Sequence, residues 1–239
     1  MLRTLLGEKP RVNQGKLKQA MDTMAFTLES FEKQMYVDHD PNHDYRKLYV
    51  WTQGLISSLD ELEQSYFAAA HFRKKVVAGS TRDMSSAEKS EYARYVYFYK
   101  DAFIRCFAIL DKLGTVLNEV FQLNTSKTKV HFSYYTVLRQ FEYYRDHHEL
   151  AQQLIKIKEA YREPMSRLRK RRNMEIHYMN SEMQDDLWQL HQTLRGKVKL
   201  EDLDQHLLEM QQGVDMVCET LNMAYRYINR IWRKQILKH

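Results

Sequence analysis

Apolar residues recur at intervals of three and four along most of the chain, a spacing that places them on one face of an α-helix. This pattern predicts a first helix over residues 15–36 and a second over about 43–78, with Gly79 as its C-terminal cap. Ser85 and Glu88 have the spacing of a capping box, which predicts the start of a long third helix. Phenylalanines widen the apolar face of this third helix, so we expect it to be central to the core.

The second half of the chain continues the helical pattern. Residues 131–146 are rich in aromatic side chains, and we favour a helix there because no second strand is available to pair with them. Helices are also predicted over 148–162 and 181–194, and Pro164 restarts the chain between them. The longest pattern covers residues 200–231 without a break, which is typical of a helix that packs along others in a bundle.

The composition supports the same fold class. Only 7 glycines and 3 prolines interrupt 239 residues, which favours helices over short strands joined by tight turns. Short connections favour antiparallel neighbours, so the sequence predicts an all-α fold, an antiparallel up-and-down helical bundle with additional helices. We expect residues 15–239 to form a single all-helical domain and residues 1–14 to form a flexible N-terminus.

Charge and apolar content indicate which partners and which cellular location to expect. The formal net charge of +6 favours phosphates, acidic proteins or anionic membrane surfaces without choosing among them. The first residues, MLRTLLGEKP, lack the apolar run of a signal peptide, and no uncharged apolar run approaches the ~18 residues of a membrane span. We therefore expect a cytoplasmic protein without integral membrane association. Cys106 and Cys218 lie within apolar helical patterns, which favours buried free thiols over a disulfide.

Two clusters could in principle hold a metal ion, and for both we favour a structural role. The stretch DHDPNHD, residues 38–44, is more simply a polar loop, because flexible ligands on one loop rarely close a site unaided. In YYRDHHE, residues 143–149, the adjacent histidines point about 100° apart on a helix, and Asp146 suits a helix N-cap. Glycine-rich phosphate loops, nucleophile elbows, His-Glu-x-x-His and Cys-x-x-Cys are all absent from the sequence. We expect no metal and no other cofactor.

The stretch RLRKRRNMEIHYM, residues 167–179, is the strongest candidate for chemistry. It has five cations in six positions, followed by Asn173 and His177. Arginine-to-histidine pairs at spacings of five to seven are expected about twice by chance in this composition, whereas requiring Asn, Asp or His directly after the arginine lowers the expectation to roughly 0.3. Only Arg172, with Asn173 and His177, meets that requirement.

This motif, in an all-helical chain and after the basic lead-in SRLRK, resembles the signature of HEPN domains, and the match is closest to a HEPN-like subfamily of bacterial proteins. Glu175 differs from the largely apolar residues common between the motif positions. The resemblance implies a helical homodimer that binds RNA. It implies one of two activities, because many members are metal-independent endoribonucleases and others are non-catalytic RNA-binding or interaction modules.

The resemblance also implies a role for each motif residue. Arg172 would stabilise charge on the scissile phosphate, and His177 would act as general base or acid while the RNA 2′-hydroxyl attacks. Asn173 would orient the site, and the product would carry a 2′,3′-cyclic phosphate. Arginine binds phosphate oxygens in bidentate fashion and histidine exchanges protons near neutral pH, so the residue types suit these roles.

Helix geometry adds a condition. Residues five apart on a helix differ by about 140°, so Arg172 and His177 do not share a face, whereas Asn173 and His177 do. A second copy about a two-fold axis would complete the site. Four further cations are predicted to contact RNA phosphates: Arg167, Arg169, Lys170 and Arg171. Tyr178 is predicted to stack on an unpaired base.

Two other interpretations remain open. The protein could be a non-enzymatic helical interaction or scaffold protein, whose basic helix docks on an acidic partner or a nucleic acid. The five cations could also form no more than a solvated face. Peripheral membrane attachment is disfavoured because no Trp or Phe anchor flanks the basic run.

Overall fold

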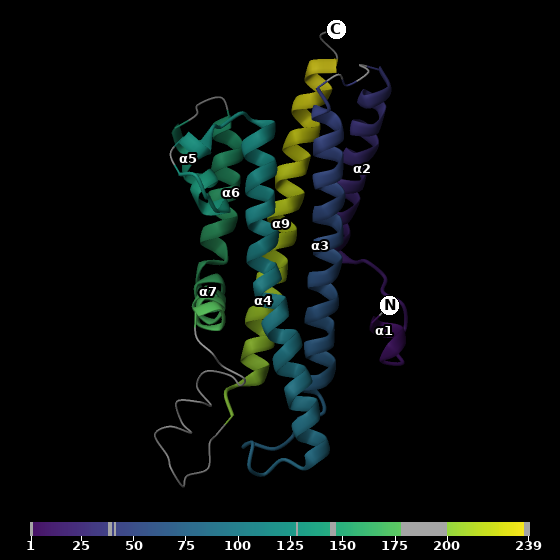
Figure 1. Ribbon diagram of the computed structural model, residues 1–239, viewed down its shortest axis with the longest axis vertical. Coiled ribbons are helices and arrows are strands. Elements are labelled where there is room, and N and C mark those ends of the chain that lie inside the picture. The colour runs from purple at the N-terminus through teal and green to yellow at the C-terminus, as the bar shows by residue number, and fades with distance from the viewer. Residues whose placement is uncertain are drawn as a thin grey trace. The chain divides into compact units, whose positions relative to one another are not determined.

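The computed structural model describes residues 2–37, 40, 42–127, 129–143, 147–177 and 200–236. Over these residues the secondary structure is helical and contains no β-strand (Figure 1). The predicted all-α fold is therefore confirmed. The predicted helix at 181–194 lies outside the described residues. Among the helices that are described, none has the length and apolar character needed to cross a membrane, and the cytoplasmic location stays a prediction.

The elements follow one another in the order that the sequence predicts, with a short additional helix at the N-terminus and with the basic motif on a helix of its own (Figure 1). They are α1 (Leu2–Leu5), α2 (Gly15–Val37), α3 (Asp44–Arg73), α4 (Ser86–Val120), the 3₁₀ turn η1 (Thr125–Lys127), α5 (Tyr134–Tyr143), α6 (His148–Ala160), α7 (Arg162–His177) and α9 (Leu203–Ile236). The aromatic stretch 131–146 contains helix α5, so the choice of helix over strand is confirmed.

The second predicted helix ends earlier than expected. α3 stops at Arg73 and not near residue 78, so Gly79 is not its cap. The Arg73 guanidinium donates to the Val76 carbonyl at 2.5 Å, and the Glu88 carboxylate accepts the backbone N–H groups of the two residues after Val76, both at 2.6 Å. These side chains offer the backbone alternative partners, and the helix gives way to a turn.

The start of α4 confirms the predicted capping residue. The Ser85 hydroxyl accepts the Glu88 backbone N–H at 3.1 Å, one position before the helix begins. The Glu88 carboxylate accepts hydrogen bonds from the backbone of Ala78, Val77 and Ser85, and these bonds lower its pKa by more than burial raises it. One acidic residue therefore serves both the start of α4 and the turn after α3.

The described chain forms two compact units, each built from three separate segments. Unit 1 comprises residues 1–11, 61–106 and 162–214, and unit 2 comprises 12–60, 107–161 and 215–239. The sequence predicts one domain for 15–239, and that domain count stays a prediction. In the N-terminal segment predicted to be flexible, Arg3 and Arg11 both contact the Glu63 carboxylate within unit 1, Arg11 at 2.9 Å.

The core of unit 1 joins α4, α7 and α9. Tyr95, Phe103 and Leu168 are fully buried or nearly so. Gly213 of α9 lies at a close approach, because a Cβ there would lie 2.7 Å from Cδ1 of Leu168. Glycine weakens a helix interior by roughly 1 kcal/mol, so its presence here allows α7 to pack closely on α9.

The core of unit 2 also contains a close approach at a glycine. A Cβ on Gly114 of α4 would lie 3.0 Å from the Tyr134 Cα at the start of α5. The buried hydroxyls of Thr52 and Tyr225 are 3.0 Å apart and satisfy each other. Cys218 is buried in this unit as a free thiol, and burial raises its pKa to about 12. Cys106 of unit 1 is also a buried thiol outside a disulfide, and it donates to the Gly213 carbonyl at 3.6 Å, so the predicted buried thiols are confirmed.

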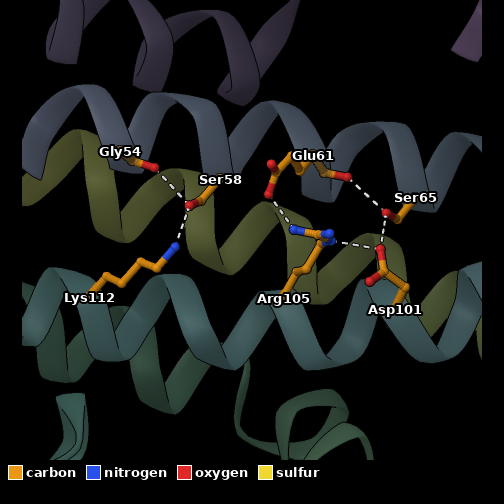
Figure 2. A network of polar contacts seen from close by, with 7 residues as sticks. All are labelled: Gly54, Ser58, Glu61, Ser65, Asp101, Arg105 and Lys112. Carbon is orange, nitrogen blue, oxygen red and sulfur yellow. Dashed lines mark hydrogen bonds and ion pairs between the residues drawn. The ribbon is translucent and has the colours of Figure 1, made fainter. Parts of the chain in front are cut away.

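Polar side chains join α3 to α4 in each unit. In unit 1, Arg105 pairs with Glu61 and with Asp101, whose Oδ2 lies 2.6 Å from the arginine Nε (Figure 2). In unit 2, Lys112 donates to the Ser58 hydroxyl at 2.7 Å, and that hydroxyl donates to a carbonyl of its own helix (Figure 2). These contacts fix the lateral alignment of the two helices within each unit.

Candidate functional site

Helix α7 carries the basic run and the motif. It begins at Arg162, directly after a break at Tyr161, and Pro164 lies in its first turn, where a proline costs no intrahelical hydrogen bond. Glu163 places a negative charge near the positive end of the helix dipole. Arginine, lysine and methionine then favour the helical conformation until it ends at His177.

One side of α7 packs into unit 1, and we call it the anchored face: Met165, Leu168, Arg171, Arg172 and Glu175. Leu168 is completely buried and Met165 is 4% exposed. The three polar members are half-buried. Apolar packing by the first turns of the helix therefore sets its position, and polar contacts continue along the same side.

Glu209 of α9 binds two cations of the basic run. Its Oε1 lies 2.6 Å from the Arg167 Nε, and its Oε2 pairs with the Arg171 guanidinium. The Glu209 side chain is 3% exposed, and Gln205 donates to it at 3.1 Å. Burial is the largest influence on the pKa of Glu209 and raises it, but the bonds from Arg171 and Gln205 outweigh it and hold the pKa below the usual range. Two of the five cations thus neutralise a buried carboxylate of the same chain.

The motif arginine, Arg172, also lies on the anchored face. Arg172 is half-buried, and its Nε atom is buried. Glu175, one turn further along, pairs with Lys100 of α4 at 2.8 Å. The ion pair with Lys100 gives Glu175 a structural role at a position where the motif usually has an apolar side chain.

The opposite side of α7, which we call the exposed face, consists of Arg169, Lys170, Asn173, Ile176 and His177. All five are exposed to solvent, and Ile176 retains 53% of its accessible surface. Asn173 and His177, four residues apart, share this face, whereas Arg172 lies on the anchored face. The separation expected from the 140° angle is therefore present. Tyr178, the predicted stacking residue, lies outside the described residues.

A sequence model of the Cthe2314-like HEPN family matches residues 51–229, which include the whole of α4, α5, α6 and α7. This chain belongs to the Cthe2314-like HEPN family. The resemblance inferred from Arg172, Asn173 and His177 is thereby confirmed, and membership supports a HEPN-type function, which is often related to RNA. Searches of curated proteins and of solved structures gave no match.

The first of the two metal candidates has a structural role in this HEPN protein. Asp40 accepts the backbone N–H groups of Tyr45 and Arg46, at 3.2 and 2.9 Å, and so caps α3. At the other cluster, α6 begins after His147, whose side chain makes no capping bond, and Asp146 lies outside the described residues. Across the described part of the chain, His, Cys, Asp and Glu side chains form no group of three that could hold a metal ion.

A buried polar cluster, which supports α7 in this HEPN protein, was not predicted from the sequence. Besides Glu209, it contains His206, whose Nε2 lies 2.9 Å from the Glu201 carboxylate. The His206 ring stacks on Tyr99, with centroids 5.4 Å apart and planes 12° apart. Burial raises the pKa of Tyr99. The available signal was the pair His206 and Glu209, polar residues one turn apart beside the apolar stripe of the last helix.

Proposed function

We propose that this HEPN protein binds single-stranded RNA as a homodimer and cleaves it as a metal-independent endoribonuclease. The observation that supports the proposal is the exposed face of α7, where Asn173 and His177 lie one turn apart beside Arg169 and Lys170. An imidazole next to an amide and two cations suits proton transfer at a phosphodiester.

The proposed reaction needs only groups of the protein and the RNA. His177 accepts the proton of the ribose 2′-hydroxyl, and the resulting oxygen attacks the adjacent phosphorus. The bond from phosphorus to the 5′-oxygen breaks, and that oxygen takes a proton from water or from the partner subunit's His177. Arg172 stabilises the negative charge that builds up on the phosphate oxygens, and Asn173 orients the phosphate. The products are a 2′,3′-cyclic phosphate and a 5′-hydroxyl.

The placement of the motif side chains supports the proposed homodimer. Arg172 is on the anchored face and His177 on the exposed face, so one α7 does not direct both at the same phosphate. Two copies related by a two-fold axis supply each residue twice. Ile176, which is 53% exposed beside His177, would be covered by the second copy.

We assign the proposed phosphate contacts to fewer cations than the basic run contains. Arg169 and Lys170 are on the exposed face, where a phosphate has access to them. Arg167 and Arg171 both pair with the single carboxylate of Glu209. Because both Arg169 and Lys170 are exposed, we assign the non-specific contacts mainly to them, and stacking by Tyr178 remains part of the proposal.

A second candidate function is a non-catalytic HEPN module, which binds RNA or an acidic partner through α7. The observation in its favour is the buried Nε of Arg172, which directs part of the guanidinium away from solvent. In that function the exposed cations would contribute affinity, and His177 would have no chemical role.

Incubation of the purified protein with single-stranded RNA in EDTA distinguishes the two functions. We expect cleavage to 2′,3′-cyclic phosphate ends by the native protein and by Ser166→Ala, a control for an exposed α7 residue outside the motif. Arg172→Ala and His177→Ala should each abolish cleavage. Binding without cleavage by the native protein supports the non-catalytic function, and a monomer in analytical ultracentrifugation contradicts the composite site.

A further inference from the structure

Unit 1 contains an open groove of about 610 Å³ beside the motif helix. It is formed by the turn that precedes α4, by the first turns of α4 and by Glu175 of α7. All of its lining residues belong to unit 1. Binding sites for small groups have volumes of roughly 300 to 1,000 Å³, so the groove has the size of a ligand site.

The groove has an apolar floor and an exposed aromatic side chain. Met84, Tyr92 and Val96 form the floor and are each 5 or 6% exposed. Tyr97, at the edge, retains 66% of its accessible surface. An exposed aromatic ring above a buried apolar floor provides surfaces on which an unpaired base can stack.

The charged lining residues favour an anion. Arg82, Lys89 and Lys100 contribute three cations, and Glu175 contributes one carboxylate, which is paired with Lys100 at 2.8 Å. Arg82 and Lys89 are exposed to solvent at the rim. A ligand that combines a flat ring with a phosphate would match both the floor and the rim.

The groove and the motif share helix α7, because the groove is lined by Glu175. Glu175 lies between Asn173 and His177 in the chain, and Arg172 precedes it by one helical turn on the anchored face. Side chains at this spacing are roughly 5 to 6 Å apart at their Cβ atoms. A nucleotide in the groove would therefore be close to the phosphate assigned to Arg172.

We propose that this groove binds one nucleotide of a single-stranded RNA, next to the bond on which the motif acts. The base stacks on Tyr97 over the apolar floor, and a phosphate oxygen contacts Lys89 or Arg82. This inference rests on the proposed function, and it adds a binding site for RNA outside the Arg172, Asn173 and His177 motif.

The test measures fluorescence anisotropy of a labelled ten-nucleotide oligouridylate in EDTA, with the full chain carrying His177→Ala to prevent cleavage. In this background, Tyr97→Ala should weaken binding about 5- to 100-fold, because a stacked base is lost. Lys89→Ala should also weaken binding, because a phosphate contact is lost. Tyr97→Phe should retain the affinity, because it keeps the ring. Matched controls on α2 in unit 2 are Tyr36→Ala, at a side chain that is 76% exposed, and Lys18→Ala.

The outcomes separate this inference from the proposed function. Losses confined to the groove variants support the site. Unchanged affinity in both groove variants, together with a loss in Arg169→Ala/Lys170→Ala, overturns the groove and leaves the proposed function intact. The absence of binding by the His177→Ala parent and by the native protein overturns both. Uridine monophosphate that binds as tightly as the oligonucleotide would show a site for free nucleotides and overturn the assignment to RNA.

Discussion

Lys170 and Arg171 are neighbours in the chain, yet they lie in different surroundings on α7. Lys170 is exposed beside Asn173, whereas Arg171 is half-buried and paired with Glu209. The same kind of charge therefore holds the helix in place on the anchored face and remains accessible to a partner on the exposed face. A count of cations in a sequence does not distinguish these roles, because the distinction depends on carboxylates that lie far away in the chain.

Loss of apolar packing should give the largest difference between the two faces. Leu168→Ala on the anchored face should lower the free energy of unfolding by roughly 2 to 5 kcal/mol, because a fully buried leucine leaves a cavity. Ser166→Ala, at an exposed position, should change it by no more than about 0.5 kcal/mol. Urea denaturation measures both, and equal effects would contradict the assignment of the faces.

Removal of the shared carboxylate should have the next largest effect. Glu209→Ala leaves two arginines without their buried partner, and we expect a loss of about 2 to 3 kcal/mol in unfolding free energy. Glu209→Gln should lose less, because the amide oxygen still accepts a hydrogen bond. A variant as stable as the native protein would show that Glu209 does not anchor α7.

The helix positions in this chain were predictable from periodicity, because apolar side chains at helical spacing must be buried together. The end of α3 was not, since it depends on Glu88, which is 15 residues away from Arg73 and bonds the turn between them. The burial of both cysteines as thiols outside a disulfide was predictable from the apolar pattern around them.

The candidate site was predictable only in part. The motif residues and the angle between Arg172 and His177 follow from local sequence and helix geometry. The pairing of Arg171 with Glu209 joins residues 38 positions apart, and the groove combines Arg82, Tyr97 and Glu175 from three separate segments. Contacts of this kind come from tertiary packing, and no local pattern in one sequence encodes them.

Removal of charge from the exposed face should lower RNA affinity and leave stability nearly unchanged, whereas the first two substitutions lower stability. Arg169→Ala/Lys170→Ala should leave the unfolding free energy within about 0.5 kcal/mol of the native value. RNA affinity should fall roughly 10-fold, because two phosphate contacts are lost. Anisotropy titration and urea denaturation of the same preparation measure the two quantities. A stability loss without an affinity loss would show that these cations stabilise the fold and do not bind RNA.

Lowering the pH should have the smallest of these effects, a loss of the stability that Glu209 contributes on the anchored face. The pKa of Glu209 is lower in the folded protein than its ordinary value of about 4.3, so its contribution to stability is complete above that pH and is lost as the pH falls through the folded value. The stability difference between the native protein and Glu209→Gln should therefore shrink as the pH falls from about 4.3 through the folded pKa. A difference that stays constant over this range in thermal denaturation would contradict the lowered pKa.

The pairing of Glu209 with Arg167 and Arg171 would also limit how strongly the proposed RNA binding depends on salt concentration. Each cation that neutralises a phosphate of a single strand releases about 0.7 counterion, so five cations on α7 would give a slope of about −3.5 for log K against log salt. Because Glu209 already pairs with Arg167 and Arg171, α7 would contribute at most three cations to phosphates, and its share of the slope would be no steeper than about −2. The internal carboxylate thereby makes the interaction less sensitive to ionic strength than the basic run alone would suggest.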